Sequence, residues 1–122
     1  MNLNDLIHRV KKHKNYENAG MILCHNGVVR STSRDGRVVE GLKIKSDRSK
    51  LDEILTKYKK TDGIVEILVS IAPDEKMLVV GDDVMFIVVA GDIRETVIET
   101  LTNVLNEIKK EVTSKTEFFV EG

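Results

Sequence analysis

The sequence has very little of several residue types that particular protein classes need. Its 122 residues include one cysteine, one proline and no tryptophan, and aromatic residues make up only 4%. The single Cys24 cannot form an internal disulfide, so we expect a reducing compartment and predict a cytoplasmic protein. No apolar run approaches the roughly 20 residues of a membrane helix, and the first residues lack the pattern of a secretory signal. We therefore expect neither a membrane-spanning nor a secreted protein.

The charge balance argues against a protein that binds nucleic acid or anionic lipid. Lysine and arginine together number 19 and aspartate and glutamate 20, which leaves a net charge of -1. Such a chain has no global attraction to nucleic acid or anionic lipid. The scarcity of aromatic side chains that could stack on bases also disfavours nucleic-acid binding. The length suits one core, so we expect residues 1–122 to form a single domain.

Three segments carry apolar residues at the i, i+3, i+4, i+7 spacing of a helix with one buried face. The first covers residues 3–14 with Asn4 or Asp5 as its cap, and the second begins near Ser46 or Ser49 and ends at residues 59–60. The third begins after Asp92, with Glu95 as the second member of a capping box. Its expected buried stripe is Val97, Ile98, Leu101, Val104, Leu105 and Ile108.

Short apolar or alternating runs between these helices predict β-strands. They are residues 19–24, 28–30, 38–45, 64–72, 77–80, 84–90 and 117–120. In residues 38–45 we expect Val38, Leu42 and Ile44 to share the buried side. The intervening residues 25–27 indicate either a tight hairpin or a bulge in one continuing strand. Because runs of strands alternate with single helices, we predict an α+β fold with a mostly antiparallel sheet and helices on one face.

The chain carries no standard catalytic motif. The nucleophile elbow, the phosphate-binding loop and the dinucleotide fingerprint are all missing from the sequence. His8, His13 and His25 lack the spacing of zinc ligands, so we expect surface histidines and no metal site. Cys24 lies inside an apolar run, which favours a structural thiol over a nucleophile.

Positive charges gather near the ends of predicted strands and helices. They are Arg30, Arg34, Arg37, Arg94, Lys109, Lys110 and Lys115. The helix dipole does not favour an arginine at a helix N-terminus, where Arg94 stands. Together with free backbone N–H groups, an arginine in this place can hold a phosphate or a carboxylate. The alternative interpretation is a set of scattered, solvated charges.

Three stretches follow one another between about residue 18 and residue 117. The first is residues 19–23, followed by the Gly-Val-Val-Arg that ends at Arg30. The second is residues 78–88, and the third is residues 91–94, followed without a gap by a long helix that ends near Lys109. In their order and spacing these stretches resemble the large, catalytic subunit of molybdopterin synthase, and residues 78–88 are similar to that family's Leu-x-x-Gly-Glu-x-x-Val stretch before its central strand.

The resemblance implies a fold, an activity and partners. The fold is an α/β hammerhead with a long C-terminal helix packed on a mostly antiparallel sheet, and the chain would form a homodimer. A ubiquitin-like small subunit would insert its thiocarboxylated C-terminal glycine into a pocket. Sulfur transfer to a cyclic pyranopterin monophosphate would then produce molybdopterin. The pyranopterin is a substrate, so no cofactor is expected.

The resemblance also points to individual residues. Arg30 and Arg94 match arginines of the family's anion-binding pocket, and we add Arg37 to this set. Lys109 matches a pocket lysine at the end of the long helix, and we expect it to act with Lys115 at the sulfur-transfer centre. An anionic, phosphorylated substrate needs such cations, and acyl chemistry needs a proton donor near the reacting carbon.

Three departures from the family pattern leave the activity open. Ile93 stands where the family has histidine, and Pro73-Asp74 stand where it has a His-Arg pair. Thr116 aligns with the family's catalytic lysine, and Lys115 lies one residue earlier, which in a strand means the opposite face. Either Lys115 substitutes for the missing lysine, or the chain is a non-catalytic paralogue that binds a sulfur-carrier protein or another anionic ligand. An unrelated α+β domain is the remaining alternative.

Overall fold

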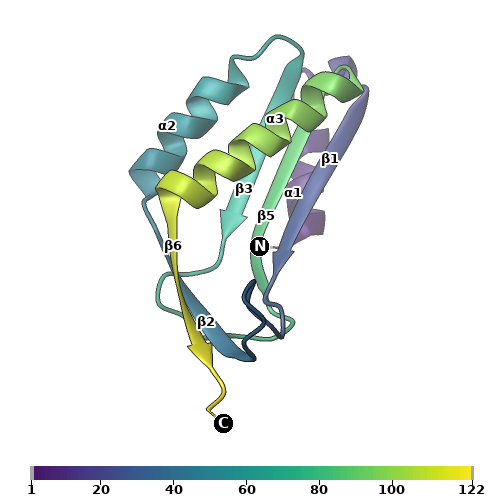
Figure 1. The fold of residues 1–122 in the computed structure, drawn as a ribbon. Coiled ribbons are helices and arrows are strands. Elements are labelled where there is room, and N and C mark those ends of the chain that lie inside the picture. The colour runs from purple at the N-terminus through teal and green to yellow at the C-terminus, as the bar shows by residue number, and fades with distance from the viewer. Residues whose placement is uncertain (1, 122) are drawn as a thin grey trace.

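The computed structural model describes residues 2–121, and Figure 1 shows their arrangement as two antiparallel sheets with three α-helices. The first sheet has the strand order β1 (Met21–Val28), β5 (Asp83–Gly91), β3 (Ile64–Ile71). The second has the order β4 (Leu78–Val79), β2 (Val39–Ser46), β6 (Thr113–Phe119). The helices are α1 (Leu3–Lys11), α2 (Arg48–Lys59) and α3 (Arg94–Glu107). A 3-10 turn (Tyr16–Asn18) precedes β1, and a π-helical turn (Ile108–Val112) joins α3 to β6.

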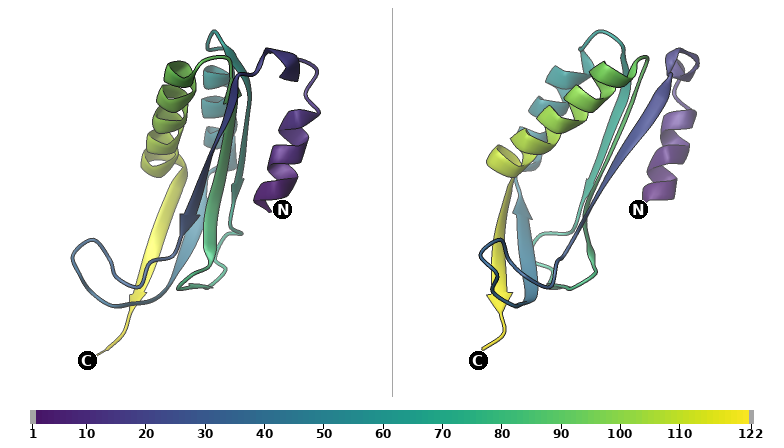
Figure 2. Two further views of the ribbon diagram at one scale, coloured as in Figure 1. Left: turned by 90° about the vertical axis from the view of Figure 1, so that its right-hand side faces the viewer. Right: turned by 45° about the vertical axis from the view of Figure 1, so that its right-hand side comes forward.

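The helices cover both faces of the first sheet. α2 and α3 lie on one face and α1 on the other, as Figure 2 shows most clearly in its left-hand view. The α+β class and the antiparallel pairing are confirmed, but the expectation of helices on one face is wrong for α1. Leu6 and Val10 of α1 pack on Phe86 and Val88 of β5, while Ile87 faces the larger core. Because β5 is buried on both faces, it forms the most apolar run in the sequence.

β1 is one continuous strand. It pairs with β5 from Met21 opposite Gly91 to Val28 opposite Asp83, with an irregularity between Gly27 and Val28. The hairpin interpretation of residues 25–27 is therefore wrong, and the bulge interpretation is confirmed. The long partner strand decides between them because it offers hydrogen bonds along the whole segment. The residues after the bulge consequently reach the second sheet.

The first two helices begin at caps that the sequence analysis did not select. Asn2 caps α1, because its side chain accepts from the backbone N–H of Asp5 at 2.9 Å, and the Asp5 carboxylate accepts from the backbone N–H of Asn2 at 3.3 Å. α1 ends at Lys11, earlier than the predicted Lys14. Asp47 caps α2, accepting from the N–H of Lys50 at 3.0 Å. Each cap satisfies one of the N–H groups that have no partner inside the helix.

The predicted capping box of α3 is wrong. Its N-cap residue is Ile93, which makes no side-chain hydrogen bond. Asp92 is held elsewhere, since its carboxylate lies against Gly63 and its backbone N–H donates to the Gly63 carbonyl at 2.8 Å. The positive φ of Gly63, +89°, closes the turn between α2 and β3 at this point. Asp92 therefore joins the end of β5 to the turn before β3 and does not cap the helix.

Two apolar residues that were expected inside are at the surface. Val38 is 55% exposed, whereas its neighbour Val39 is 5% exposed, because the pairing of β2 with β6 is irregular between Val39 and Gly41. This irregularity brings Val39 to the same side as Leu42. Ile98 of α3 is 46% exposed. Both corrections concern which face a residue lies on, and neither changes the type of element.

Candidate functional site

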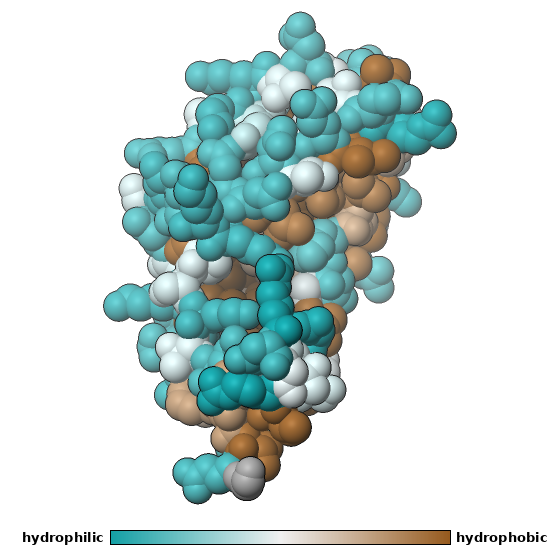
Figure 3. Space-filling model, viewed as in Figure 1, coloured by the Kyte–Doolittle hydropathy of each residue, from teal (hydrophilic) through white to brown (hydrophobic). Residues whose placement is uncertain are grey.

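A pocket of about 330 Å³ lies where the end of β1, the loop after it, β2, the π-helical turn and β6 meet. Its buried lining is apolar and consists of Val29, Val39 and Leu42. Its charged lining consists of four exposed cations, Arg30, Arg34, Lys109 and Lys115, and one half-buried acid, Glu117. Figure 3 shows hydrophilic side chains around a hollow with hydrophobic atoms at its base. The arrangement suits a ligand with negative groups and an apolar or planar body.

The π-helical turn presents Lys109 to the pocket. Ile108 and Val112 anchor the turn in the core, with exposed fractions of 0% and 5%, and Lys109 between them is exposed. The end of α3 just before the turn is tied to α2. Glu107 accepts a hydrogen bond from the Lys57 ammonium at 2.8 Å and another from the Tyr58 hydroxyl. These contacts, with Lys57 first, lower the pKa of Glu107 and keep its carboxylate charged.

Lys115, and not Thr116, faces the pocket. Lys115 and Glu117 both line it, whereas Thr116 lies opposite Lys43 on the other face of the second sheet. The reason is local: β6 begins at Thr113, directly after the π-helical turn, so no loop separates the turn from the strand. The turn therefore sets which residues of the strand point inward. The structure places Lys115 beside the pocket that Lys109 lines, and its chemical role remains a prediction.

The pocket has an excess of positive charge. The Lys115 ammonium lies 3.7 Å from the Glu117 carboxylate. Within residues 2–121, no carboxylate lies within 4.0 Å of Arg30, Arg34 or Lys109. Uncompensated guanidinium and ammonium groups around one cavity attract phosphates and carboxylates and bind them through charge-assisted hydrogen bonds.

Two predicted anion-binding arginines lie outside this pocket. The Arg37 guanidinium stacks on the ring of Phe119, 3.5 Å from its centroid. Arg94 begins α3, its side chain is 77% exposed, and it lies 3.7 Å from Glu95. Fifteen residues separate Arg94 from Lys109, about 20 Å along a helix. One chain therefore does not bring Arg94 to the pocket, and its role in anion binding remains a prediction.

Comparison with known proteins gives the family. The family model described as MoaE protein matches residues 1–111. The chain belongs to the MoaE protein family. Comparison of the sequence with curated proteins finds no significant match.

Solved structures of MoaE-type proteins share the fold. A Burkholderia ambifaria molybdopterin biosynthesis MoaE protein is 16% identical, with a TM-score of 0.76, 98% of this chain and 82% of that chain covered. Molybdopterin synthase from Staphylococcus aureus is 20% identical, with a TM-score of 0.73 and coverages of 91% and 87%. A complex of subunits 1 and 2 of the molybdopterin-converting factor from Helicobacter pylori is 17% identical, with a TM-score of 0.73 and coverages of 98% and 80%.

His25 is a titratable residue of this MoaE-family chain that the sequence analysis placed at the surface. It is half-buried on β1, and its Nε2 lies 3.4 Å from the position that a Cβ on Gly27 would take. Burial, and secondarily the charge of Lys109, lower the pKa of His25, so the imidazole is neutral at physiological pH. His25 follows Leu23 by two residues, and residues two apart in a strand lie on the same face. Because Leu23 packs in the larger core, this spacing was a sequence signal that could have placed His25 on the inner face.

Cys24 points to the opposite face of the same strand. It packs, half-buried, against the cluster under α1, and burial raises the pKa of its thiol. A raised pKa keeps the thiol protonated and makes it a poor nucleophile. The structural interpretation of Cys24 is therefore the one that its surroundings support.

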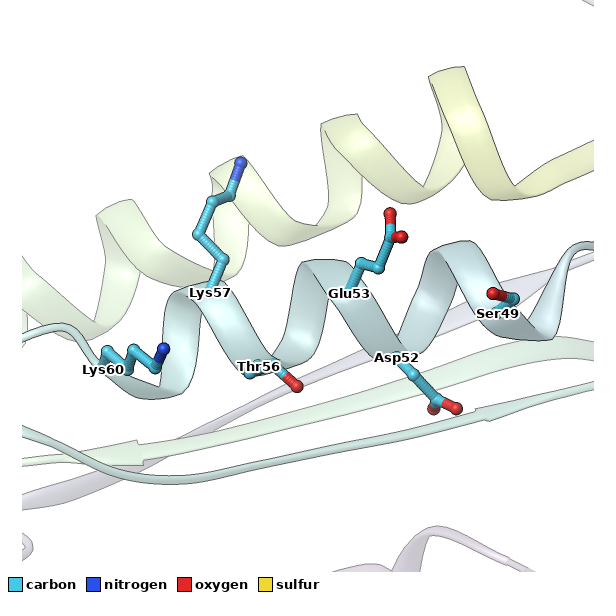
Figure 4. Close-up of a pocket in the computed structure, with 6 residues that line it drawn as sticks. All are labelled: Ser49, Asp52, Glu53, Thr56, Lys57 and Lys60. Atoms are coloured by element: carbon cyan, nitrogen blue, oxygen red, sulfur yellow. The ribbon is translucent and has the colours of Figure 1, made fainter.

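A larger hollow of about 870 Å³ on this MoaE-family chain has no convergent chemistry. One helix, α2, supplies its lining residues, which Figure 4 draws as Ser49, Asp52, Glu53, Thr56, Lys57 and Lys60. The side chains diverge, with Lys57 and Glu53 on one side of the helix and Asp52 and Thr56 on the other. Two acids, Asp52 and Glu53, and two lysines, Lys57 and Lys60, lie along an open surface. We interpret it as the solvated face of α2.

The described part of this MoaE-family chain has neither a metal-binding cluster nor a membrane-spanning helix. Among residues 2–121, no group of three or more His, Cys, Asp or Glu side chains is placed to hold a metal ion. The helices within the same range are too short or too polar to cross a membrane.

Proposed function

We propose that the chain is the catalytic large subunit of a molybdopterin synthase. Membership of the MoaE family places it in molybdenum cofactor biosynthesis. The reaction would move sulfur from the thiocarboxylated C-terminus of a ubiquitin-like small subunit to a cyclic pyranopterin monophosphate. The two-subunit Helicobacter pylori complex, which has the same fold in its matching chain, supports a small-subunit partner.

The position of Lys115 is the observation that carries this proposal. The lysine that is out of place in the sequence shares the pocket with Arg30 and Lys109. Two lysines and an arginine that follows β1 line one pocket and could supply the cationic groups that the proposed reaction needs. Arginine suits a phosphate because its planar fork donates two hydrogen bonds.

Each of the two sulfur transfers that build the dithiolene divides into two steps. The thiocarboxylate sulfur attacks a pyranopterin carbon and displaces one of its oxygen substituents, so that a carbon–sulfur bond forms as a carbon–oxygen bond breaks and the departing oxygen keeps the bonding electrons. The product of this step is a thioester between the two partners. Water then attacks the acyl carbon and the carbon–sulfur bond breaks, leaving sulfur on the pterin and a carboxylate on the small subunit. Negative charge develops on the acyl oxygen during this attack. The ammonium groups of Lys109 and Lys115 stabilise that charge and donate hydrogen bonds to the oxygen.

We also propose a homodimer. Ile93 and Ile98 lie near the N-terminal end of α3 and are 55% and 46% exposed, so an interface there would remove their apolar surface from water. Arg94 lies between them in sequence and does not reach the pocket of its own chain. An interface at this place would bury the two isoleucines and carry Arg94 to the partner's pocket.

A binding protein without catalysis is the second candidate. Ile93 lacks the proton-transferring group that the family has at this position, and Glu117 partly neutralises Lys115 at 3.7 Å. Such a paralogue would keep the anion-binding pocket and the partner surface. It would bind a sulfur-carrier protein or another anionic ligand without turnover.

A single-turnover assay separates the two functions. The protein is mixed with a thiocarboxylated small subunit and the cyclic pyranopterin monophosphate, and formation of the dithiolene is followed over time. The synthase proposal expects product on the first turnover. Saturable binding of the small subunit without product would establish the non-catalytic alternative, and absence of both would overturn both proposals.

A further inference from the structure

The loop between β1 and β2 is a small hairpin that holds Arg34 at its tip. The Ser33 carbonyl accepts from the Gly36 N–H at 3.0 Å, and the Ser33 N–H donates to the Arg37 carbonyl at 2.9 Å. Gly36 has a φ of +87°, which a three-residue hairpin loop requires at this position. The loop is thus a closed turn with defined hydrogen bonds. Arg34 occupies its first central position and lines the pocket.

The only acid in this turn, Asp35, forms its hydrogen bonds inside the turn and no ion pair with Arg34. The Ser33 hydroxyl donates to the Asp35 carboxylate, and the Arg37 N–H donates to the same carboxylate oxygen at 3.4 Å. The hydrogen bond from Ser33 is the main reason that the pKa of Asp35 is lowered. Because this carboxylate is engaged inside the turn, it does not compensate Arg34. Asp35 is also not among the residues that line the pocket.

The cations of the pocket form two groups from different parts of the chain. Arg30 and Arg34 come from the end of β1 and the loop after it, and Lys109 and Lys115 come from the π-helical turn and β6. The two groups also differ in chemistry. Two guanidinium forks suit the several oxygens of a phosphate, whereas ammonium groups act as mobile point charges.

We propose that Arg34 is a specificity-determining residue that binds, together with Arg30, the phosphate group of the substrate. This division leaves Lys109 and Lys115 to the group that undergoes transfer. The identity of the phosphorylated molecule rests on the proposed function. The anion-binding role of Arg34 rests only on the turn geometry and the uncompensated charge, so it can be tested without the complete reaction.

Binding of inorganic phosphate to the full chain tests the site directly. Backbone amide shifts of residues 28–39 are followed during titration with phosphate, at constant ionic strength kept with sodium chloride so that screening does not change. Arg34→Gln should weaken phosphate binding about tenfold, since it removes a charge-assisted contact. Arg34→Lys should restore part of the affinity. Arg48→Gln is the matched control, because Arg48 is an exposed arginine that does not line the pocket.

The second measurement uses the reaction. With the thiocarboxylated small subunit present, Arg34→Gln should raise the KM for the cyclic pyranopterin monophosphate about tenfold and change kcat less than about twofold. A merely structural role would reduce the folded fraction or kcat and would not weaken binding of phosphate alone.

The outcomes for the two proposals are distinguishable. Phosphate affinity of Arg34→Gln equal to that of the unsubstituted protein overturns the role of Arg34, whatever the synthase assay gives. Weaker phosphate binding by Arg34→Gln, in a protein that forms no dithiolene, supports the role of Arg34 and counts against the catalytic function. A fall in kcat with an unchanged KM would also contradict the proposal.

Discussion

The Lys115 ammonium lies 3.7 Å from the Glu117 carboxylate on the face of β6 that lines the pocket, and Thr116 between them is on the other face. This relationship decides which residue can replace the family's lysine. A strand reverses the side-chain direction at every residue. Lys115 stands one residue before the position that aligns with the family's lysine. In this chain, however, residue 115 and not residue 116 of β6 faces the pocket.

Exchanging the two residues tests this assignment. We expect Lys115→Thr combined with Thr116→Lys to lose nearly all sulfur transfer, because the lysine then projects beside Lys43 and away from the pocket. Single-turnover dithiolene formation is the measurement, and a thermal melt checks that the exchanged protein folds. Retained activity in the exchanged protein would show that Thr116 and not Lys115 occupies the catalytic position.

Lys109 and Lys110 form a matched pair in the π-helical turn. Both are exposed lysines, but only Lys109 lines the pocket. We expect Lys109→Ala to reduce the single-turnover rate by about 10²–10⁴-fold, as loss of a positioned proton donor or charge stabiliser does. Lys110→Ala should remain within about twofold, because surface substitutions away from a site have small effects. Equal rates for the two variants would remove Lys109 from the mechanism.

Arg94 should act from the partner chain if it acts at all. We expect Arg94→Ala and Lys109→Ala to be inactive separately and to recover about a quarter of the activity per site after mixing and refolding together, since random pairing creates that share of intact composite pockets. The recovered rate is measured against the unsubstituted protein treated in the same way. An inactive mixture in which native mass spectrometry shows mixed dimers would contradict action across an interface.

The titration of His25 reports on Lys109. Burial and the Lys109 charge lower its pKa from 6.5, so Lys109→Met should raise the pKa of His25 while burial still holds it below 6.5. The measurement is an NMR titration of the imidazole C–H signals in the two proteins. No change in the substituted protein would mean that the Lys109 charge does not act on His25.

The same shift predicts how stability depends on pH. Below 6.5 the unfolded chain binds a proton at His25 more readily than the folded chain does, so the free energy of unfolding falls as pH decreases from 6.5 through the folded pKa. In His25→Gln this contribution to the slope should disappear. Urea unfolding at several pH values between about 5 and 7 checks the difference, and parallel curves for the two proteins would refute it.

Much of the fold follows from local sequence pattern. The apolar run of residues 84–90 predicts a central strand because only a strand buried on both faces is apolar throughout, and β5 is that strand. The apolar residues from Val97 to Ile108 predict α3, because residues three or four apart lie on one face of a helix that can be buried. The ends of elements were less predictable. We expected Asn4 or Asp5 to cap the first helix and the second helix to begin near Ser46 or Ser49, but Asn2 and Asp47 are the caps. Several polar residues near a helix start can make this hydrogen bond, and the sequence does not say which one does.

The sequence by itself determined which side chains carry charge and roughly where along the chain the strands and helices lie, because these depend on composition and on periods of 2 and 3.6 residues. Only the tertiary structure decided which of them meet. It brought Arg34 to the pocket, stacked Arg37 on Phe119, left Arg94 at the far end of α3 and turned Lys115 inward. The reason is that strand register and helix phase are set by pairing and packing with distant segments, and a shift of one residue reverses a side chain without changing the pattern that predicts the element.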